Sequence, residues 1–164
     1  DTVFYKNFEY SLKIFTKILE KYPNVILIKI GNSFTKKIDT SINDKIFNFN
    51  NLSRIQMANL YKCCDLLLFP SLYEGYGIPC LEAMKCGIPV IGSNKASLKE
   101  LLDIKSQFSL NKDLKIINHI IKLFTNKNYL NKNKIISINQ SKNFKRSEYP
   151  NKINSLYKKI LDQN

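Results

Sequence analysis

The sequence has no long apolar run. None of its hydrophobic stretches approaches the roughly 20 residues that a membrane-spanning helix needs, and its first residues show no signal-peptide pattern. A length of 164 residues is that of one ordinary domain, and an apolar share of 44% suffices for a sizeable core. We therefore expect one folded domain over residues 1–164. Because the chain does not begin with Met and opens directly into a helical pattern, we expect it to be part of a longer protein.

Clustered metal ligands and cysteine pairs are also missing. None of the four cysteines belongs to a Cys-x-x-Cys pair, and the single histidine, His119, is far from all of them in sequence. A zinc site needs such clustered ligands, so we expect no structural zinc. We predict that Cys63, Cys64 and Cys86 are small buried residues, as in a protein of the reducing cytoplasm.

Acidic residues are scarce. The chain has 13 Asp and Glu against 26 Lys and Arg, and residues 105–164 alone have 13 basic residues against 3 acidic ones. A basic segment can contact nucleic acid or anionic lipid. The same residues are rich in neutral Asn, however, and no aromatic-flanked basic motif or Gly-Arg pattern is present, so we predict no nucleic-acid partner. Two interpretations stay open: solvated helix faces, and peripheral contact with the inner face of a membrane.

Apolar strands alternate with amphipathic helices along the chain. The segments Val25–Ile30, Asp65–Phe69 and Ile88–Gly92 are apolar on both faces, which is typical of a parallel sheet covered on both sides by helices. We predict a Rossmann-like, doubly wound α/β domain, with the sheet core at about residues 1–104 and helices over 105–164. The other predicted elements are helices at 7–22, 53–61, 79–87, 96–103, 112–125, 129–140 and 150–161, a loop at 32–46, a short strand at 45–49 and an extended segment at 106–110.

A glycine-rich turn follows the second of these strands. In a parallel sheet, ligands bind beyond the carboxyl ends of the strands, where loops meet helix N-termini. Gly75 and Gly77 permit a tight turn with a close approach of the backbone to a ligand, and a helix starting near Pro79 offers its positive dipole end to phosphate. Glu74 and Glu82 flank this turn, and a carboxylate accepts hydrogen bonds from the neighbouring hydroxyls of a sugar. By these residues alone, a polyol and phosphate site and a pair of ordinary surface acids are equally good interpretations.

The wider pattern resembles a known family. Glu74 and Glu82 are separated by seven residues, Glu-Gly-Tyr-Gly-Ile-Pro runs from Glu74 to Pro79, and Glu-Ala-Met-Lys-Cys-Gly-Ile-Pro-Val-Ile runs from Glu82 to Ile91. This closely resembles the E-x7-E signature of retaining glycosyltransferases, most of all those of family four. Members of that family have two facing Rossmann-like domains, the GT-B architecture, and this chain resembles the C-terminal, donor-binding domain. The similarity is strong from about Tyr5 to Leu102 and says little about the individual sugar.

The resemblance implies roles for individual residues. Glu74 and Lys6 would be the catalytic residues: Glu74 would hold hydroxyls of the donor sugar near the anomeric carbon, and Lys6 would neutralise the diphosphate leaving group. Glu82 would hold the ribose of the nucleotide. The remaining substrate-binding residues implied by the resemblance are Gly31, Gly75, Tyr76, Gly77 and Ile78. We do not assign Glu74 as a nucleophile.

The implied reaction is the transfer of a hexose-type sugar from a nucleoside diphosphate to a glycan or a lipid-linked acceptor, with retention of configuration. No Asp-x-Asp pair occurs in the chain, so we predict metal-independent transfer without a cofactor beyond the donor. The family's first strand, an Arg before Lys6 and the N-terminal acceptor domain are absent from this sequence. We therefore expect a parent about twice as long, and weak donor binding without turnover by this chain alone. Two alternatives stay open: a GT-B phosphorylase or epimerase, and a non-catalytic nucleotide-sugar-binding relic.

Overall fold

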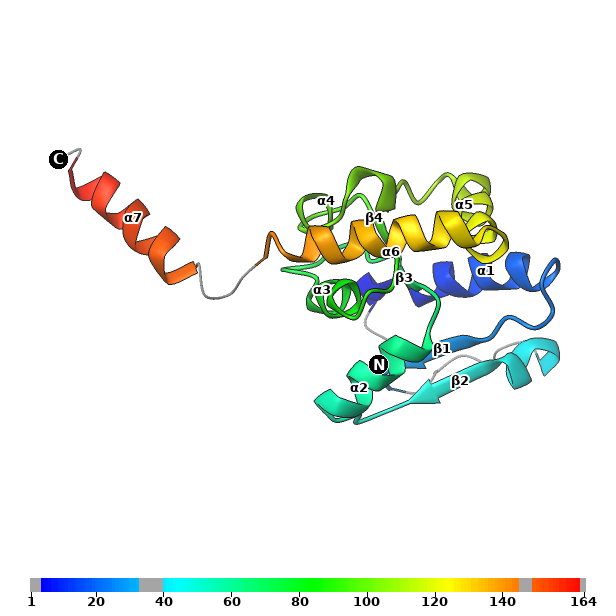
Figure 1. The fold of residues 1–164 in the computed structure, drawn as a ribbon. Coiled ribbons are helices and arrows are strands. Elements are labelled where there is room, and N and C mark those ends of the chain that lie inside the picture. Colours follow the sequence, from blue (N-terminus) through cyan, green and yellow to red (C-terminus); the bar gives the residue numbers. More distant parts are fainter. Residues whose placement is uncertain (1–3, 33–39, 145–148, 163–164) are drawn as a thin grey trace.

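Parallel strands and helices alternate in the computed structural model, which describes residues 4–32, 40–144 and 149–162 (Figure 1). The elements are η1 (Phe4–Lys6), α1 (Phe8–Leu19), β1 (Leu27–Ile30), η2 (Thr40–Lys45), β2 (Ile46–Phe49), α2 (Arg54–Cys63), β3 (Leu67–Phe69), α3 (Ile78–Lys85), β4 (Val90–Ser93), α4 (Leu98–Leu101), η3 (Ile104–Ser106), β5 (Gln107–Phe108), α5 (Asp113–Thr125), α6 (Lys127–Ser141) and α7 (Tyr149–Leu161). The short 3-10 helix η2 falls in the segment predicted as a loop. Residues 33–39 of that segment lie outside the described residues.

Helix ends follow local signals, with two corrections. Ser53 caps α2 through a capping box with Gln56, as polar N-caps do. Asn7, predicted to cap α1, makes no such bond; its backbone is left-handed, with φ of 52°, and its side chain contacts another segment. The helix predicted to begin at Pro79 begins at Ile78, so the proline occupies the second position, where its missing N–H costs nothing.

The strands form two parallel sheets. β1 pairs with β2, and β3 pairs with β4, which pairs with β5. The prediction of a parallel α/β fold is confirmed. The predicted single sheet is not: the described residues form two separate sheets. The strands β1 and β3, predicted to be buried on both faces, are at most half-buried, whereas all four residues of β4 are buried. The strand β5 extends the larger sheet beyond residue 104.

The core lies on both faces of β4. On one face, Ile91 belongs to a cluster with residues of α1 and α5, including Ile14 and Ile120, which are almost completely buried. On the other face, Val90 packs in a cluster with Met84 of α3 and the buried leucines of α4. Helices thus cover β4 from both sides, as expected for the α/β class.

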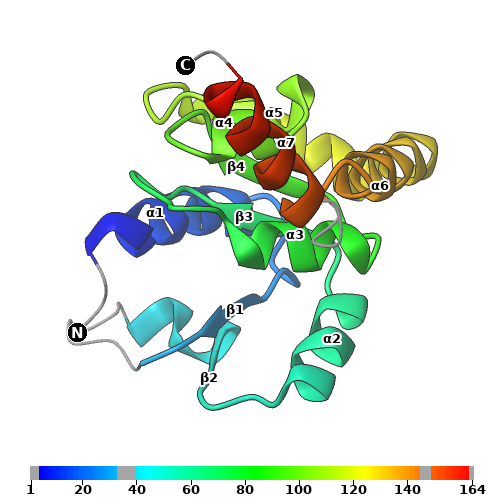
Figure 2. The same cartoon turned by 90° about the vertical axis from the view of Figure 1, so that its left-hand side faces the viewer.

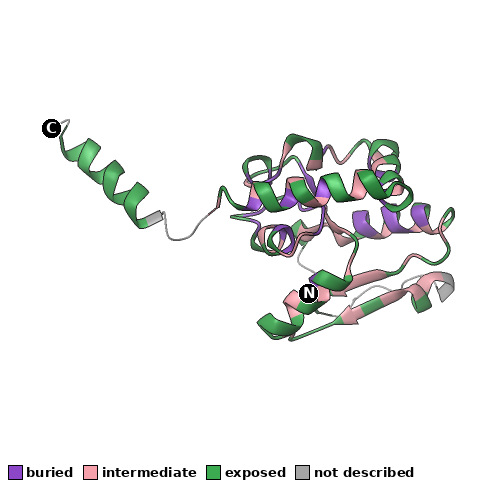
Figure 3. Ribbon diagram, viewed as in Figure 1, coloured by how far each residue is buried: buried purple, intermediate pink, exposed green. Residues whose placement is uncertain are grey.

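The C-terminal helices differ in their packing. α6 packs against α3 and α5. α7 projects away from the rest of the domain in Figure 1, and in Figure 2, where that side faces the viewer, it lies in front of the domain. Every described side chain of α7 is exposed (Figure 3). None of the helices formed by the described residues is long and apolar enough to cross a bilayer.

The cysteines are less uniformly buried than predicted. Cys63 is exposed and Cys64 and Cys86 are half-buried; only Cys80 is fully buried. Cys63 is exposed because it lies in the last turn of α2, a helix with a single buried residue, Tyr61. All four thiols are free, and burial raises the pKa of Cys80.

Candidate functional site

The segment before α1 is held against the loop that follows β3. The carbonyl oxygen of Tyr5 accepts a hydrogen bond of 2.7 Å from the Leu72 amide. The side-chain amide of Asn7 donates a bond of 3.2 Å to the carbonyl oxygen of Pro70. The left-handed backbone of Asn7 directs its side chain to this acceptor, and asparagine tolerates that conformation better than most residues. Between these two anchors, Lys6 is placed beside Glu74.

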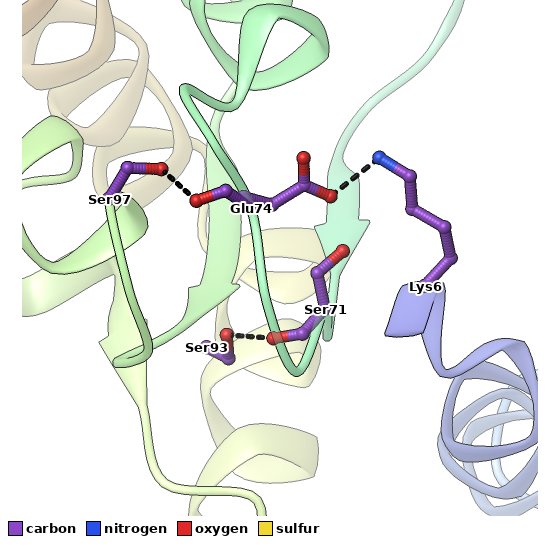
Figure 4. A network of polar contacts seen from close by, with 5 residues as sticks. All are labelled: Lys6, Ser71, Glu74, Ser93 and Ser97. Carbon is purple, nitrogen blue, oxygen red and sulfur yellow. Dashed lines mark hydrogen bonds and ion pairs between the residues drawn. The ribbon is translucent and has the colours of Figure 1, made fainter. Parts of the chain in front are cut away.

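Lys6 and Glu74 form an ion pair, although 68 positions separate them in the sequence (Figure 4). The lysine Nζ lies 2.5 Å from the Glu74 carboxylate; the glutamate side chain is 9% exposed and the lysine 37%. Nζ also lies 4.9 Å from the centroid of the Phe69 ring, at a distance where an aromatic face attracts a cation. The ammonium group is therefore held at the carboxyl end of β3 by a carboxylate and an aromatic ring.

Two serine hydroxyls hold the backbone of the segment from Ser71 to Glu74. The Ser97 hydroxyl donates a bond of 2.9 Å to the Glu74 carbonyl oxygen, and the Ser93 hydroxyl donates to the Ser71 carbonyl oxygen (Figure 4). Ser71 itself is 1% exposed, and its hydroxyl has no hydrogen-bond partner among the described residues. A buried hydroxyl of this kind calls for an explanation. In the sequence, Ser71 is marked only by its place two residues after the end of β3, and this position predicts no role for it.

The two glycines of the turn have different physical reasons to be glycine. Gly77 has a left-handed φ of 81°, and a Cβ there would lie 2.8 Å from Leu98 Cδ2 and 2.9 Å from Leu101 Cδ2. Both leucines are buried at the centre of a core cluster, so Gly77 is required by the fold. At Gly75 the φ is not left-handed, and an added Cβ would meet nothing within 4 Å. The fold does not require a glycine there, and the missing side chain leaves the backbone open to a ligand.

The start of α3 offers fewer amides than expected. Pro79 has no N–H, and the Cys80 amide bonds to the Gly77 carbonyl oxygen at 3.0 Å. What the helix can present to an anion is its dipole together with the amides of Gly77 and Ile78. The Ile78 side chain is exposed, and the Tyr76 ring packs edge-on against Phe144. The roles of Tyr76, Gly77 and Ile78 in substrate binding stay predictions of the sequence.

The two remaining predicted site residues, Gly31 and Glu82, take no part in the ion pair. Glu82 is exposed about one turn into α3. Burial raises the pKa of the Tyr61 hydroxyl and the Glu82 carboxylate adds to the shift, which places this carboxylate near α2. Gly31 directly follows β1, has a φ of 113° and lines one groove together with Lys6. The two acids therefore lie in different surroundings: Glu74 is buried against Lys6, and Glu82 is exposed on α3.

No metal centre is evident in the part of the chain that the structure describes: no three His, Cys, Asp or Glu side chains gather there as ligands would. Metal-independent transfer stays a prediction of the sequence.

Comparison with known proteins identifies the family. The sequence family described as "Glycosyl transferases group 1" matches residues 2–142, most of the chain. The chain belongs to this family. The serotype-specific mannosyltransferase WbdA of Escherichia coli is 30% identical over 136 residues, which are 78% of this chain and 17% of that protein. This chain thus spans less than a fifth of the length of that relative.

Solved structures of group 1 glycosyltransferases and similar enzymes share the fold. The C-terminal domain of a glycosyl transferase group 1 family protein from Francisella tularensis superposes with a TM-score of 0.71 and 17% identity, over 85% of this chain and 79% of that one. The pneumococcal O-GlcNAc transferase GtfA, in complex with UDP and GlcNAc, gives a TM-score of 0.75 and 16% identity, over 95% of this chain and 33% of that one. The predicted family and GT-B fold class are confirmed. The roles of the individual site residues are not tested by these comparisons.

Proposed function

We propose that this chain is the donor-binding half of a retaining glycosyltransferase that transfers a hexose from a nucleoside diphosphate to a glycan or lipid-linked acceptor. The observation that carries the proposal is the contact between Lys6 and Glu74 beside the glycine turn. It brings a cation and a hydroxyl acceptor together at the carboxyl edge of the strands, where ligands bind in α/β folds. An acceptor-binding domain of the same protein would complete the cleft.

Cleavage of a sugar–phosphate bond leaves negative charge on the departing diphosphate and positive character on the sugar ring. The Lys6 ammonium and the dipole of α3 would stabilise the departing phosphate. Glu74 would accept hydrogen bonds from sugar hydroxyls near the anomeric carbon, and Glu82 from the ribose hydroxyls. Because Lys6 and Glu74 are paired in the free chain, donor binding must redirect the ammonium from the carboxylate to the phosphate.

Mannose is the first donor sugar to test, because the relative WbdA is named a mannosyltransferase. The sequence does not indicate the nucleotide base. The complex of the similar O-GlcNAc transferase contains UDP. A thermal-shift screen should therefore compare mannose, glucose and N-acetylglucosamine donors on both UDP and GDP.

The expected result is a rise in melting temperature with one donor and no rise with the free sugar. At a donor concentration 100 times the dissociation constant, the stabilisation is about 2.7 kcal/mol. For a domain of this size that corresponds to roughly 5–10 °C. Lys6→Met should abolish the shift, whereas Lys21→Met, an exposed lysine beyond the end of α1, should preserve it. If no nucleotide sugar stabilises the folded chain, the proposal is wrong.

Peripheral contact with the inner, cytoplasmic face of a membrane belongs to the same proposal. The exposed helix α7 has apolar residues at helical spacing, among them Ile153, Leu156 and Ile160, together with several lysines. Such a face suits an anionic bilayer surface. Flotation with vesicles of anionic phospholipid should bind the wild-type chain and release Leu156→Ser; equal flotation of both would remove the support for this contact.

A further inference from the structure

A pocket outside the candidate donor site lies beside β5, which is at the edge of the larger sheet formed by the described strands. Its volume of about 310 Å³ is at the lower end of the range for small-molecule sites in proteins. Buried side chains of Ile91, Phe108 and Ile116 form its apolar wall. None of the predicted donor-site residues is among the described residues that line it, so donor binding does not account for this pocket.

The polar side chains that line the pocket are mostly cations and hydrogen-bond donors. Lys105 comes from η3, and Lys115 and His119 come from α5. Because residues four positions apart lie on one face of a helix, Lys115 and His119 reach the pocket from the same face. Tyr129 of α6 adds a phenol, and none of the described lining residues is acidic. The lining therefore favours an anion.

The cationic side chains of the pocket are not neutralised within the part of the chain that the structure describes. Neither Lys105 nor Lys115 forms an ion pair there, and the His119 ring makes no hydrogen bond. The two acids nearby in sequence have other partners: the Asp103 carboxylate accepts a bond of 2.9 Å from the Lys105 amide, and the Asp113 carboxylate is bonded to residues of α1. The two ammonium groups and the imidazole are therefore available to a ligand.

An aromatic contact holds His119 in the pocket. Its ring lies edge-on to the Tyr129 ring, with the centroids 5.7 Å apart, and the Lys122 Nζ lies 4.4 Å from the Tyr129 centroid. Burial, followed by the charges of Lys122 and Lys115, holds the pKa of His119 below its usual value, so the ring is neutral near neutral pH. A bound anion would offset these lysine charges and favour the charged imidazolium.

We propose that this pocket binds a phosphomonoester, with Lys105, Lys115 and His119 as its anion-binding groups. A phosphomonoester carries close to two negative charges near neutral pH and has three strong acceptor oxygens. Two ammonium groups and one ring N–H supply donors to those oxygens. The apolar wall of the pocket would cover the carbon atoms next to the phosphate. The site goes beyond the proposed donor binding and does not depend on it.

Gln107 adds an acceptor of fixed orientation to the pocket. Its side-chain Nε2 donates bonds of 2.9 Å and 2.8 Å to the carbonyl oxygens of Lys99 and Leu102. The amide oxygen is thereby left to accept a hydrogen bond from a ligand. A phosphomonoester that also has a hydroxyl group, such as glycerol 3-phosphate, therefore suits the lining better than inorganic phosphate does.

The single histidine of the chain reports on this pocket alone, because a phosphate bound at the donor site meets no histidine. Titration of the folded chain with glycerol 3-phosphate should give a saturable shift of the His119 Cε1 proton resonance. Binding should also raise the proton affinity of His119 about tenfold, seen as a higher pKa of that resonance. Sodium chloride at equal ionic strength is the control, because screening of the lysine charges acts in the same direction.

Matched lysine variants locate the site. Lys105→Met and Lys115→Met should each weaken the binding of glycerol 3-phosphate about fivefold or more. Lys132→Met, which removes an exposed lysine of α6 that does not line the pocket, should bind as the wild type does. The His119 response should persist in Lys6→Met, so a failure of the proposed donor site would leave this proposal standing.

The same phosphate group occurs free and on lipids, and vesicles distinguish the two sources. A preference for phosphatidic acid over the phosphodiester phosphatidylglycerol in flotation, lost in Lys105→Met, would assign the pocket to a lipid headgroup. Two results would overturn the proposal. One is a His119 response to glycerol 3-phosphate no larger than that to sodium chloride, together with no lipid preference. The other is equal binding by the wild type, Lys105→Met and Lys115→Met.

Discussion

Adding one methyl group at Gly77 and at Gly75 should have opposite effects. At Gly77, alanine would have to adopt a φ of 81°, at a cost of about 1–2 kcal/mol for a left-handed residue. Its Cβ would also lie within 3 Å of Leu98 and Leu101, and forcing an extra carbon into a packed core costs about 1–3 kcal/mol. Those leucines are 1% and 2% exposed and have little room to move. We expect Gly77→Ala to destabilise the chain by about 3 kcal/mol, or roughly 6–12 °C in melting temperature.

At Gly75 the same change should be neutral or slightly stabilising for the fold. An added Cβ meets nothing within 4 Å, and alanine restricts the unfolded chain more than glycine does, by about 0.4–1 kcal/mol. If the turn approaches a donor through its backbone, the methyl group should nevertheless weaken nucleotide binding about tenfold or more.

Thermal unfolding and calorimetric titration of both variants check this pair of expectations. A drop of less than about 3 °C for Gly77→Ala would contradict the packing of α4 against the turn. Unchanged nucleotide binding by Gly75→Ala would contradict the backbone approach.

Three other predictions concern neighbouring polar groups. In urea unfolding, Lys6→Met should destabilise the chain by about 1–2 kcal/mol, because it leaves the Glu74 carboxylate, which is 9% exposed, without its partner. Glu74→Gln should destabilise it by less, because water reaches the Lys6 ammonium that remains. Equal losses of stability in the two variants would refute this asymmetry. Ser71→Ala should stabilise the free chain by about 1 kcal/mol, because it removes a buried hydroxyl that has no hydrogen-bond partner among the described residues. The same change should weaken donor binding if that hydroxyl contacts the ligand. A loss of stability would show that the hydroxyl is hydrogen-bonded in solution. Burial and two nearby lysines hold the pKa of His119 below its usual value. As the pH drops below about 6.5, the unfolded chain therefore binds a proton at His119 before the folded chain does, and the stability of the fold should decrease. His119→Gln should flatten this part of a plot of melting temperature against pH, and an unchanged slope would contradict the prediction.

The elements of the fold could be predicted from the sequence because their signals are local. Apolar periodicity gave α1 and α5 to within a few residues, and Ser53 with Gln56 marked the start of α2. The separation into two sheets could not be predicted. Strand pairing depends on how the tertiary structure places the strands relative to one another, and the composition of a strand does not contain that information. The half-burial of β1 and β3 has the same cause.

The site could be predicted only in part. Glu74 and Lys6 were named through the family resemblance, and the structure shows them in contact. No sequence pattern indicated that they neutralise each other in the free chain, because 68 positions separate them. Nor does the sequence distinguish the roles of the two glycines: Gly77 is fixed by contacts with α4, which lies 21 positions further along.

Calorimetric titration of the folded chain with UDP and with GDP tests the donor-site proposal most directly. We expect saturable binding of at least one of them, in the millimolar range or tighter. Glu82→Gln should weaken it about tenfold or more, because a charged acceptor of hydroxyl hydrogen bonds is lost. Glu20→Gln, which removes another exposed acid at the C-cap of α1, should bind as the wild type does. If neither UDP nor GDP binds, or if Glu82→Gln binds as tightly as the wild type, the proposed donor site is wrong.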